Sequence, residues 1–368
     1  MNKDEAGVLE LGIQALQDLL GEQWTLDQPA GSDFEAGDSG FDARVQIKPP
    51  SGGDPRVELL IQVRENLTPR DAMTHLAPVA SVLRQTQAQA PLVVLSSWLS
   101  PRTRQALTDQ GIGYLDLTGN VALSVSSPAI RLLTHGADKA LNKPATQQTR
   151  SVTLKGSRAG RVVRFLADFT PPYQGKQIAE ATTVGAPWVS KLLGQLENEL
   201  LVRRDGRTVA EVDWPELLRA RARNYDLLKH NEPIGLIAPQ GIDAVLEKIR
   251  TSRRPRVAVT GPFAARAVAP LTTGGQLMVY VDNADAWADE LGLLRVEENA
   301  DVLLLRAHDN VVFERTRLVD GVAHVALTQL VLDGLAGPGR MPAEAEAVLQ
   351  HLVEREPEWR RPWISPDR

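Results

Sequence analysis

Residues 158–209 constrain the fold of this chain most strongly, because three short segments with apolar side chains at helical spacing precede a hairpin pattern. The three segments are residues 161–169, 175–181 and 187–200. The third runs directly into residues 201–209, where two β-prone pieces flank the dipeptide Asp205-Gly206. We therefore predict two helices, a tight turn, a third helix and a β-hairpin.

The third predicted helix has an apolar and a polar face. Its apolar stripe, expected to pack on the first two helices, is Val189, Leu192, Leu193, Leu196 and Leu200. Pro187 suits a first helical position, where its missing N–H costs nothing. The first turn would then offer free backbone N–H groups and a positive dipole end, both of which suit a phosphate.

This order of elements is that of a winged helix-turn-helix, whose third helix enters the DNA major groove and whose hairpin meets the flanking backbone. Serine, glutamine and lysine side chains can reach base edges or phosphates, and arginines on a hairpin suit phosphates. The residues that we expect to contact DNA are Lys176, Trp188, Ser190, Lys191, Gln195, Arg203, Arg204 and Arg207.

The charge distribution favours DNA as the partner. Residues 150–223 contain 13 Lys and Arg against 8 Asp and Glu, a net charge of +5, whereas the whole chain has a net charge of −5. A basic segment in an acidic chain is typical of a nucleic-acid-binding module. The alternative is a winged helix that contacts only protein and carries ordinary solvated cations. By its layout, the segment resembles the winged helices of bacterial MarR- and IclR-type regulators.

Composition limits the remaining possibilities. A chain of 368 residues predicts two or three domains. It has no cysteine, which excludes disulfides, thiolate metal sites and cysteine nucleophiles, and its six histidines lack ligand spacing. We therefore expect no metal and no cofactor. The apolar runs are too short to span a bilayer, and the N-terminus lacks a signal-peptide pattern, so we expect a cytoplasmic protein with no membrane partner.

The N-terminal region, residues 1–140, alternates helical and strand patterns. An amphipathic helix is expected around residues 9–20, and strands at 41–47, 57–64, 91–95, 111–117 and 121–125. Thr68 and Ser100, each followed by proline, are expected N-caps, and Pro78 should kink or end the first half of its helix. Residues 113–120 resemble a recurrent segment of bacterial regulators that join such a domain to a winged helix.

This succession of elements resembles the core of restriction-endonuclease-like domains. In that family, an Asp on one strand and an acidic-x-Lys triplet on the next bind a divalent metal and polarise the attacking water. Asp42 stands where the first acid belongs, but the triplet position contains Gln62 and Arg64. Glutamine brings no charge to a hard cation, and arginine stays protonated and cannot act as a base. The resemblance therefore implies a retained scaffold without catalytic chemistry.

The C-terminal region, residues 232–368, reads as a further α/β unit behind a charged connecting helix at 219–231. A strand at 255–261 meets a glycine turn, but neither nucleotide-binding glycine pattern is present. Residues 261–265, 279–282, 301–305 and 327–333, with Gly339-Arg340 and 344–346, resemble the C-terminal domain of AbiEi-type antitoxins. Those proteins repress toxin–antitoxin operons in bacteria, but they begin with their winged helix, whereas here it lies mid-chain.

The sequence thus predicts a multidomain α/β and α+β protein with a central winged helix-turn-helix. The expected domains are residues 1–140, a nuclease-like domain without activity; 150–225, the DNA-binding domain; and 232–368, an antitoxin-like α/β domain. The favoured function is sequence-specific binding of double-stranded DNA by a homodimeric, non-enzymatic transcriptional regulator, a repressor of its own or a neighbouring operon. The alternatives are a metal-dependent nuclease targeted by the winged helix and a protein-interaction scaffold.

Overall fold

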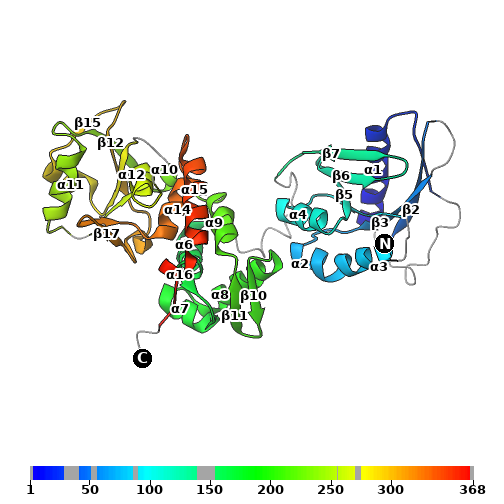
Figure 1. The fold of residues 1–368 in the computed structure, drawn as a ribbon, viewed down its shortest axis with the longest axis horizontal. Coiled ribbons are helices and arrows are strands. Elements are labelled where there is room, and N and C mark those ends of the chain that lie inside the picture. The colour runs from blue at the N-terminus through cyan, green and yellow to red at the C-terminus, as the bar shows by residue number, and fades with distance from the viewer. Residues whose placement is uncertain are drawn as a thin grey trace. The chain divides into compact units, whose positions relative to one another are not determined.

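The computed structural model describes residues 3–28, 41–50, 56–85, 90–138, 154–254, 256–269 and 275–364. The chain divides into two compact units. We call residues 1–151 with 195–200 the N-terminal unit, and residues 152–194 with 201–368 the C-terminal unit. Both are mixed α/β (Figure 1). No helix in the described ranges is both long and apolar enough to cross a bilayer.

The N-terminal unit is built on a seven-stranded sheet whose strands follow one another in chain order. Strands β3, β4 and β5 are parallel, and the pairs on either side of them are antiparallel. The strands are β1 (Thr25–Asp27), β2 (Ala43–Lys48), β3 (Val57–Val63), β4 (Leu92–Ser96), β5 (Gly113–Asp116), β6 (Val121–Val125) and β7 (Ile130–Thr134).

Helices cover both faces of this sheet, because its central strands are apolar on both sides. On one face α1 (Lys3–Leu20) packs against side chains such as Ile61 and Val93, and on the other Leu60 and Val94 meet the remaining helices. Those helices are α2 (Pro69–Asp71), the π-helical turn η1 (Ala72–Leu76), α3 (Ala77–Gln85) and α4 (Pro101–Asp109).

Local sequence signals set the helix boundaries as predicted. The Thr68 side chain accepts a hydrogen bond from the Asp71 backbone N–H, and the Asp71 carboxylate accepts one in return. The Ser100 side chain caps α4 by accepting from the Thr103 N–H. Pro78 lies in the first turn of α3, and the π-helical turn η1 directly precedes α3. Proline has no N–H to donate to the preceding helical turn, and a wider π-helical turn is one way in which a helix accommodates this missing hydrogen bond.

The C-terminal unit begins with three helices and a small sheet. The helices are α6 (Gly156–Asp168), α7 (Gly175–Thr182) and α8 (Ala186–Asn198), of which α8 belongs to this unit up to Gly194. The three-stranded sheet has the order β10 (Val202–Asp205), β11 (Thr208–Val212), β9 (Tyr173–Gln174). Strand β9 lies between α6 and α7 in the chain and pairs antiparallel with β11. The predicted order of helix, helix, turn, helix and hairpin is present.

A second seven-stranded sheet completes this unit. Its mixed order is β15 (Leu294–Arg295), β12 (Pro233–Ile237), β16 (Val302–Arg306), β14 (Leu277–Val281), β13 (Val257–Thr260), β18 (Val322–His324), β17 (Arg317–Val319). The accompanying helices are α9 (Trp214–Ala222), α10 (Leu227–His230), α11 (Ile242–Thr251), α12 (Gly261–Arg266), α13 (Ala284–Leu291), the short 3-10 helix η2 (Asn310–Phe313), α14 (Leu327–Leu335), α15 (Met341–Glu354) and α16 (Glu356–Trp359). In place of one connecting helix at 219–231, the chain forms α9 and α10, and α9 packs on α6 and α14.

Helix α6 is buried on most sides, since it contacts α7, α9, α14 and η2. Its Arg164 side chain is fully buried and pairs with Asp168, 3.1 Å away, one turn further along the helix. The Arg164 guanidinium also donates to the side chains of Thr328 at 3.1 Å and Gln329 at 2.6 Å, both on α14. A buried arginine needs such partners because its charge cannot be lost by deprotonation.

The C-terminal segment closes the C-terminal end of α6. Arg360, 5% exposed, donates to the carbonyl oxygens of Leu166 at 2.8 Å, Ala167 at 3.0 Å and Phe169 at 2.9 Å. These are carbonyls of the last helical turn and the residue after it, where a cation also meets the negative end of the helix dipole. Strand β19 (Arg361–Pro362) then pairs with β8 (Phe169–Thr170). The segments expected as separate domains at 150–225 and 232–368 are therefore packed together here.

A buried carboxylate, Asp333, joins α14 to the sheet. It accepts hydrogen bonds from Thr260 at 2.7 Å, Tyr280 at 3.0 Å and Gln329 at 2.7 Å. Burial raises the pKa of Asp333 to about 6, against the lowering effect of these hydrogen bonds. Gln329 also accepts from Arg164, so a continuous buried polar chain runs from α6 through α14 to the sheet.

We predict that Arg164→Ala lowers the free energy of unfolding of the C-terminal unit by about 3 kcal/mol, the low end for a broken buried ion pair. The low end applies because Asp168 keeps Arg315 at 2.5 Å. Chemical denaturation of the full chain would measure the change. Arg158→Ala, at an exposed position of the same helix, is the matched control and should change stability by less than about 0.5 kcal/mol. Equal effects of both substitutions would contradict the role given to Arg164.

We also predict a pH-dependent stability that depends on Asp333. Its pKa is raised on folding, so between about pH 4 and pH 6 the folded state holds a proton that the unfolded chain has released. Stability conferred by this group is therefore highest at low pH and falls as pH rises. Relative to Asp333→Asn, the wild-type chain should lose about 2 kcal/mol between pH 4 and pH 7. Denaturation curves at several pH values would measure this, and parallel pH profiles of the two proteins would refute it.

Candidate nucleic-acid interface

All eight residues expected to contact DNA lie on α7, α8 and the β10–β11 hairpin. Helix α7 ends at Thr182, and the C-cap residue Thr183 has a left-handed φ of 53° that turns the chain toward α8. A Cβ on Gly175 would lie 3.5 Å from Leu193 Cδ1, so the start of α7 packs closely on α8. The Arg204 guanidinium lies near Gly194, 4.0 Å from where a Cβ would be, which brings the hairpin beside α8.

The apolar stripe of α8 is largely as predicted. Four of its members are at most 2% exposed, namely Val189, Leu192, Leu193 and Leu196. The fifth prediction, Leu200, is wrong, because this side chain is 41% exposed. Helix α8 ends at Asn198 and Leu200 adopts a left-handed φ of 55°, which takes it off the helical stripe. Leu201, 2% exposed, is buried in its place.

The polar positions of α7 and α8 differ in how far they reach solvent. Ser190 and Lys191 are exposed, whereas Trp188 and Gln195 are half-buried. Lys176 on α7 is exposed and lies 3.7 Å from Glu180 on the next turn. Ser190 and Lys191 are therefore the two α8 side chains most accessible to a macromolecular partner.

The three hairpin arginines also have different surroundings. Arg203 pairs with Glu211 at 2.6 Å and Asp205 at 2.8 Å. The hydrogen bond to Glu211 is the main cause of a raised pKa for Arg203, and it lowers the pKa of Glu211 in turn. Two carboxylates thus compensate the Arg203 charge. Arg207 is exposed in the turn itself, next to Gly206 with a φ of 62°, so it is the best-placed hairpin cation for a phosphate.

The net charge counted over residues 150–223 overstates the positive electrostatic potential at the surface of α7, α8 and the β10–β11 hairpin. Arg164 and Arg221 are buried, at 0% and 5% exposed. Two further arginines pair with carboxylates from outside the segment: Arg161 lies 2.9 Å from Asp309, and Arg219 lies 2.5 Å from Glu346. Much of the basic character of the segment serves to hold the C-terminal unit together.

In the N-terminal unit, the residues of the nuclease-like pattern have structural partners. The Asp42 carboxylate accepts from the Val63 N–H at 2.8 Å and lies 3.7 Å from Arg64. Two further carboxylates, Glu58 on β3 and Glu65 just after it, are also paired. Glu65 accepts from the Ser97 N–H at 2.8 Å, and Glu58 lies 3.7 Å from Arg44. Within the described ranges, no group of three or more His, Asp or Glu side chains is placed to hold a metal ion.

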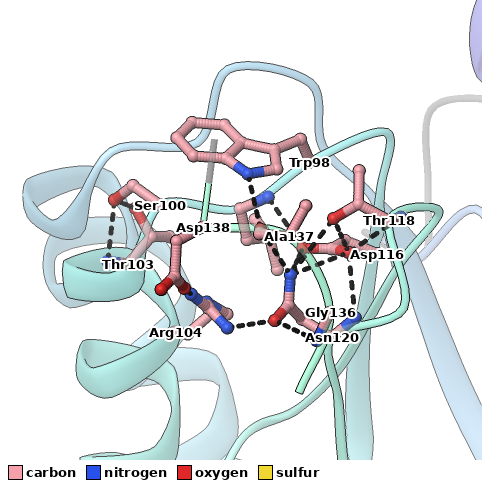
Figure 2. A network of polar contacts seen from close by, with 11 residues as sticks. Trp98, Ser100, Thr103, Arg104, Asp116, Thr118, Asn120, Gly136, Ala137 and Asp138 are labelled. Carbon is pink, nitrogen blue, oxygen red and sulfur yellow. Dashed lines mark hydrogen bonds and ion pairs between the residues drawn. The ribbon is translucent and has the colours of Figure 1, made fainter. Parts of the chain in front are cut away.

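A buried polar network fills the end of the sheet where β4 and β5 finish (Figure 2). Asp116, 2% exposed, accepts from the backbone N–H groups of Leu99 at 3.1 Å, Thr118 at 3.0 Å and Asn120 at 3.1 Å. The Asn120 amide donates to Asp116 at 3.0 Å. Because backbone and amide donors occupy both carboxylate oxygens, Asp116 shapes the turn rather than offering a free ligand.

The same network holds the chain that follows β7. Asn120 accepts from the Gly136 N–H at 2.9 Å and from Arg104, and Arg104 lies 2.6 Å from Asp138 (Figure 2). The Trp98 indole N–H donates to the Ala137 carbonyl at 3.2 Å. A Cβ on Gly136 would lie 2.0 Å from the Thr118 carbonyl oxygen, so only glycine fits this close approach.

The sequence singled out residues 113–120 only by a resemblance and did not indicate the partners Arg104 and Gly136. Three polar residues at even spacing, Asp116, Thr118 and Asn120, between two apolar strands were the available signal for a hydrogen-bonded turn. Arg104 offered no signal, since in the sequence it is one of several polar residues on an amphipathic helix.

The comparisons with known proteins add no relatives to this picture. No family model matches the chain, and neither a curated protein nor a solved structure is significantly similar to it.

Proposed function

We propose that α6–β11 acts as a winged helix that binds double-stranded DNA, and that the protein is a sequence-specific transcriptional regulator. The observation that carries the proposal is the element order α6, β8, β9, α7, α8, β10, β11, with β9 paired to β11. In this arrangement a hairpin follows directly on a helix whose outer face is polar. Winged helices that bind DNA use the same pair of elements: the helix contacts base edges, and the hairpin contacts the DNA backbone.

The exposed side chains of α8 support a role for this helix in recognising DNA sequence. Ser190 and Lys191 are exposed on its first turns, where they could hydrogen-bond base edges. Gln195, half-buried, is a weaker candidate than the sequence alone indicated. Arg207 at the hairpin tip and Lys176 on α7 are exposed cations that suit phosphates.

We propose further that the protein acts as a homodimer and represses its own or a neighbouring operon. A two-fold dimer would place two α8 helices on successive half-sites of a palindromic operator. The nuclease alternative is not favoured, because Asp42 is engaged by Val63 and Arg64. The described residues also hold no group of three or more acidic or histidine side chains that could bind a metal ion. A scaffold that binds only protein is tested by the DNA measurements below.

We predict that substitutions on α8 and on the hairpin affect DNA binding differently. Lys191→Ala and Ser190→Ala should each weaken binding to the cognate site by roughly 1–3 kcal/mol. The affinity of these variants for random DNA should be almost unchanged. Arg207→Ala should weaken binding to both and lower the slope of log K against log salt by about one unit. The cognate site would be found by protection mapping of the DNA next to the gene, and affinities measured by fluorescence anisotropy.

Lys229→Ala is the matched control, since this exposed lysine lies on α10, outside the proposed winged helix. It should leave both affinities unchanged. Equal losses on cognate and random DNA for Ser190→Ala and Lys191→Ala would show that α8 does not read sequence. Absence of any measurable DNA binding would refute the proposed function and favour the scaffold.

We also predict that the protein does not cut DNA. Supercoiled plasmid incubated with the full chain and Mg²⁺ or Mn²⁺ should stay supercoiled on an agarose gel, because the triplet position supplies Gln62 and Arg64 instead of an acid and a lysine. Metal-dependent nicking that disappears in Asp42→Ala would overturn this expectation and restore the nuclease alternative.

A further inference from the structure

A cavity of about 610 Å³ opens in the C-terminal unit beside α6, the end of α7 and η2. This volume lies within the range of sites that bind small organic molecules, roughly 300–1,000 Å³. The cavity walls combine aromatic rings with ionised side chains. The proposed DNA contacts do not use it, since none of the eight expected residues lines it.

The apolar part of the wall is an aromatic cluster centred on Phe165 of α6. Its ring centroid lies 5.1 Å from that of Phe169 and 5.7 Å from that of Trp363. The Phe169 and Trp363 side chains are half-buried, so each keeps some surface toward solvent. Tilted and edge-on rings of this kind expose π-faces as well as ring edges, and such faces attract cations.

The charged part of the wall has more carboxylates than cations. Arg161 is compensated by Asp309 at 2.9 Å, and Arg315 is compensated by Glu314 at 3.1 Å and by Asp168 behind the wall at 2.5 Å. Glu180 is the third lining carboxylate, and its pairing with the exposed Lys176 spans 3.7 Å. The described lining residues thus carry two positive and three negative charges.

The wall already contains one cation on an aromatic face. The Arg315 guanidinium carbon lies 5.2 Å from the centre of the Phe169 ring. Cation and aromatic ring attract at this separation because the face of the ring is electronegative. An anionic ligand would have to displace carboxylates from both arginines. A cationic ligand meets aromatic rings and the Glu180 carboxylate, whose ion pair with Lys176 is solvent-exposed and spans 3.7 Å.

From these observations we propose that the cavity is a binding site for a small aromatic cation, such as an arylalkyl-ammonium compound. Its rings would pack on the cluster of Phe165, Phe169 and Trp363, and its charge would lie toward Glu180. Neutral or anionic aromatics of the same size would bind more weakly.

The site is connected to α8 through the turn that precedes it. Thr182 and Thr183 line the cavity, and the Arg161 guanidinium donates to the Thr183 hydroxyl at 3.3 Å. Thr183 is the left-handed residue that sets the direction between α7 and α8. A ligand that displaces this turn changes the orientation of α8, and this coupling, unlike the binding itself, rests on the proposed function.

The binding test uses three probes of similar size with the full chain and no DNA: benzyltrimethylammonium, benzenesulfonate and benzyl alcohol. Titrations followed by the NMR signals of the tryptophan indole N–H groups should shift the Trp363 signal, assigned with Trp363→Leu. We expect the cation to bind at least about tenfold more tightly than the other two. Tighter binding of benzenesulfonate, or no probe-dependent shift of the Trp363 signal, would overturn the proposal.

Two variants and a control locate the site. Glu180→Gln, at an exposed position that tolerates substitution, should weaken cation binding about threefold, and Trp363→Leu about tenfold. Glu298→Gln, at an exposed position that is not part of the cavity lining, should leave the cation affinity unchanged. If Trp363→Leu fails to fold, as judged by circular dichroism, Glu180→Gln alone tests the site. An unchanged cation affinity of Glu180→Gln would then refute the proposal that the charge of the ligand lies toward Glu180.

A second arm tests the coupling by measuring DNA affinity with and without benzyltrimethylammonium. We expect saturation of the cavity to change the affinity for the cognate site at least about threefold in the wild-type chain. In Glu180→Gln the same change should need about threefold more probe to reach its midpoint. Cation binding without any DNA binding would uphold the cavity and refute the proposed function. DNA binding that the bound cation leaves unchanged would uphold both and refute the coupling.

Discussion

The C-terminal unit depends on one buried charge, the guanidinium of Arg164. A group that cannot lose its proton has to be matched where it is buried, and α14, η2 and Asp168 supply the matching oxygens. Each of these partners is fixed by a further one. Gln329 is held by Asp333, which is held by the sheet residues Thr260 and Tyr280. The position of α6 is therefore determined by the sheet as much as by its own neighbours α7 and α9.

The same helix is fixed at its end by residues from the last part of the described chain. Arg360 binds three carbonyl oxygens there, and Trp359 packs edge-on against Trp214 at 5.1 Å. Trp214, in turn, donates to Glu356 at 3.0 Å. The segment that reads as an independent DNA-binding module in the sequence is thus completed by side chains almost two hundred residues away. Removing the C-terminal residues would expose the polar end of α6 together with its aromatic cluster.

Local patterns were predictable, and long-range charge pairing was not. The stripe of α8, the hairpin after it and the caps at Thr68 and Ser100 depend on residues within a few positions, so spacing alone reveals them. The turn of the hairpin lies one residue further on than predicted, at Gly206 and Arg207, because Asp205 pairs with Thr208. The prediction for Leu200 was wrong because the left-handed turn after α8 contains no glycine, the residue that usually indicates such a turn in a sequence. Of the expected DNA contacts, Ser190 and Lys191 are exposed as the helical period requires, whereas Arg203 is compensated across the hairpin. For Arg161 and Arg164 the decisive partners lie 148 and 165 residues away, beyond any local pattern.

The network around Asn120 also extends the N-terminal unit beyond its last strand. Strand β7 ends at Thr134, yet the Gly136 N–H donates to Asn120 and the Asp138 carboxylate pairs with Arg104. A truncation after Thr134 would remove these two partners from the side chains of Asn120 and Arg104, which are both buried. Buried polar groups that lose a partner cost roughly 1–3 kcal/mol each. The boundary of a stable fragment is therefore set by this polar network and not by the last strand of the sheet.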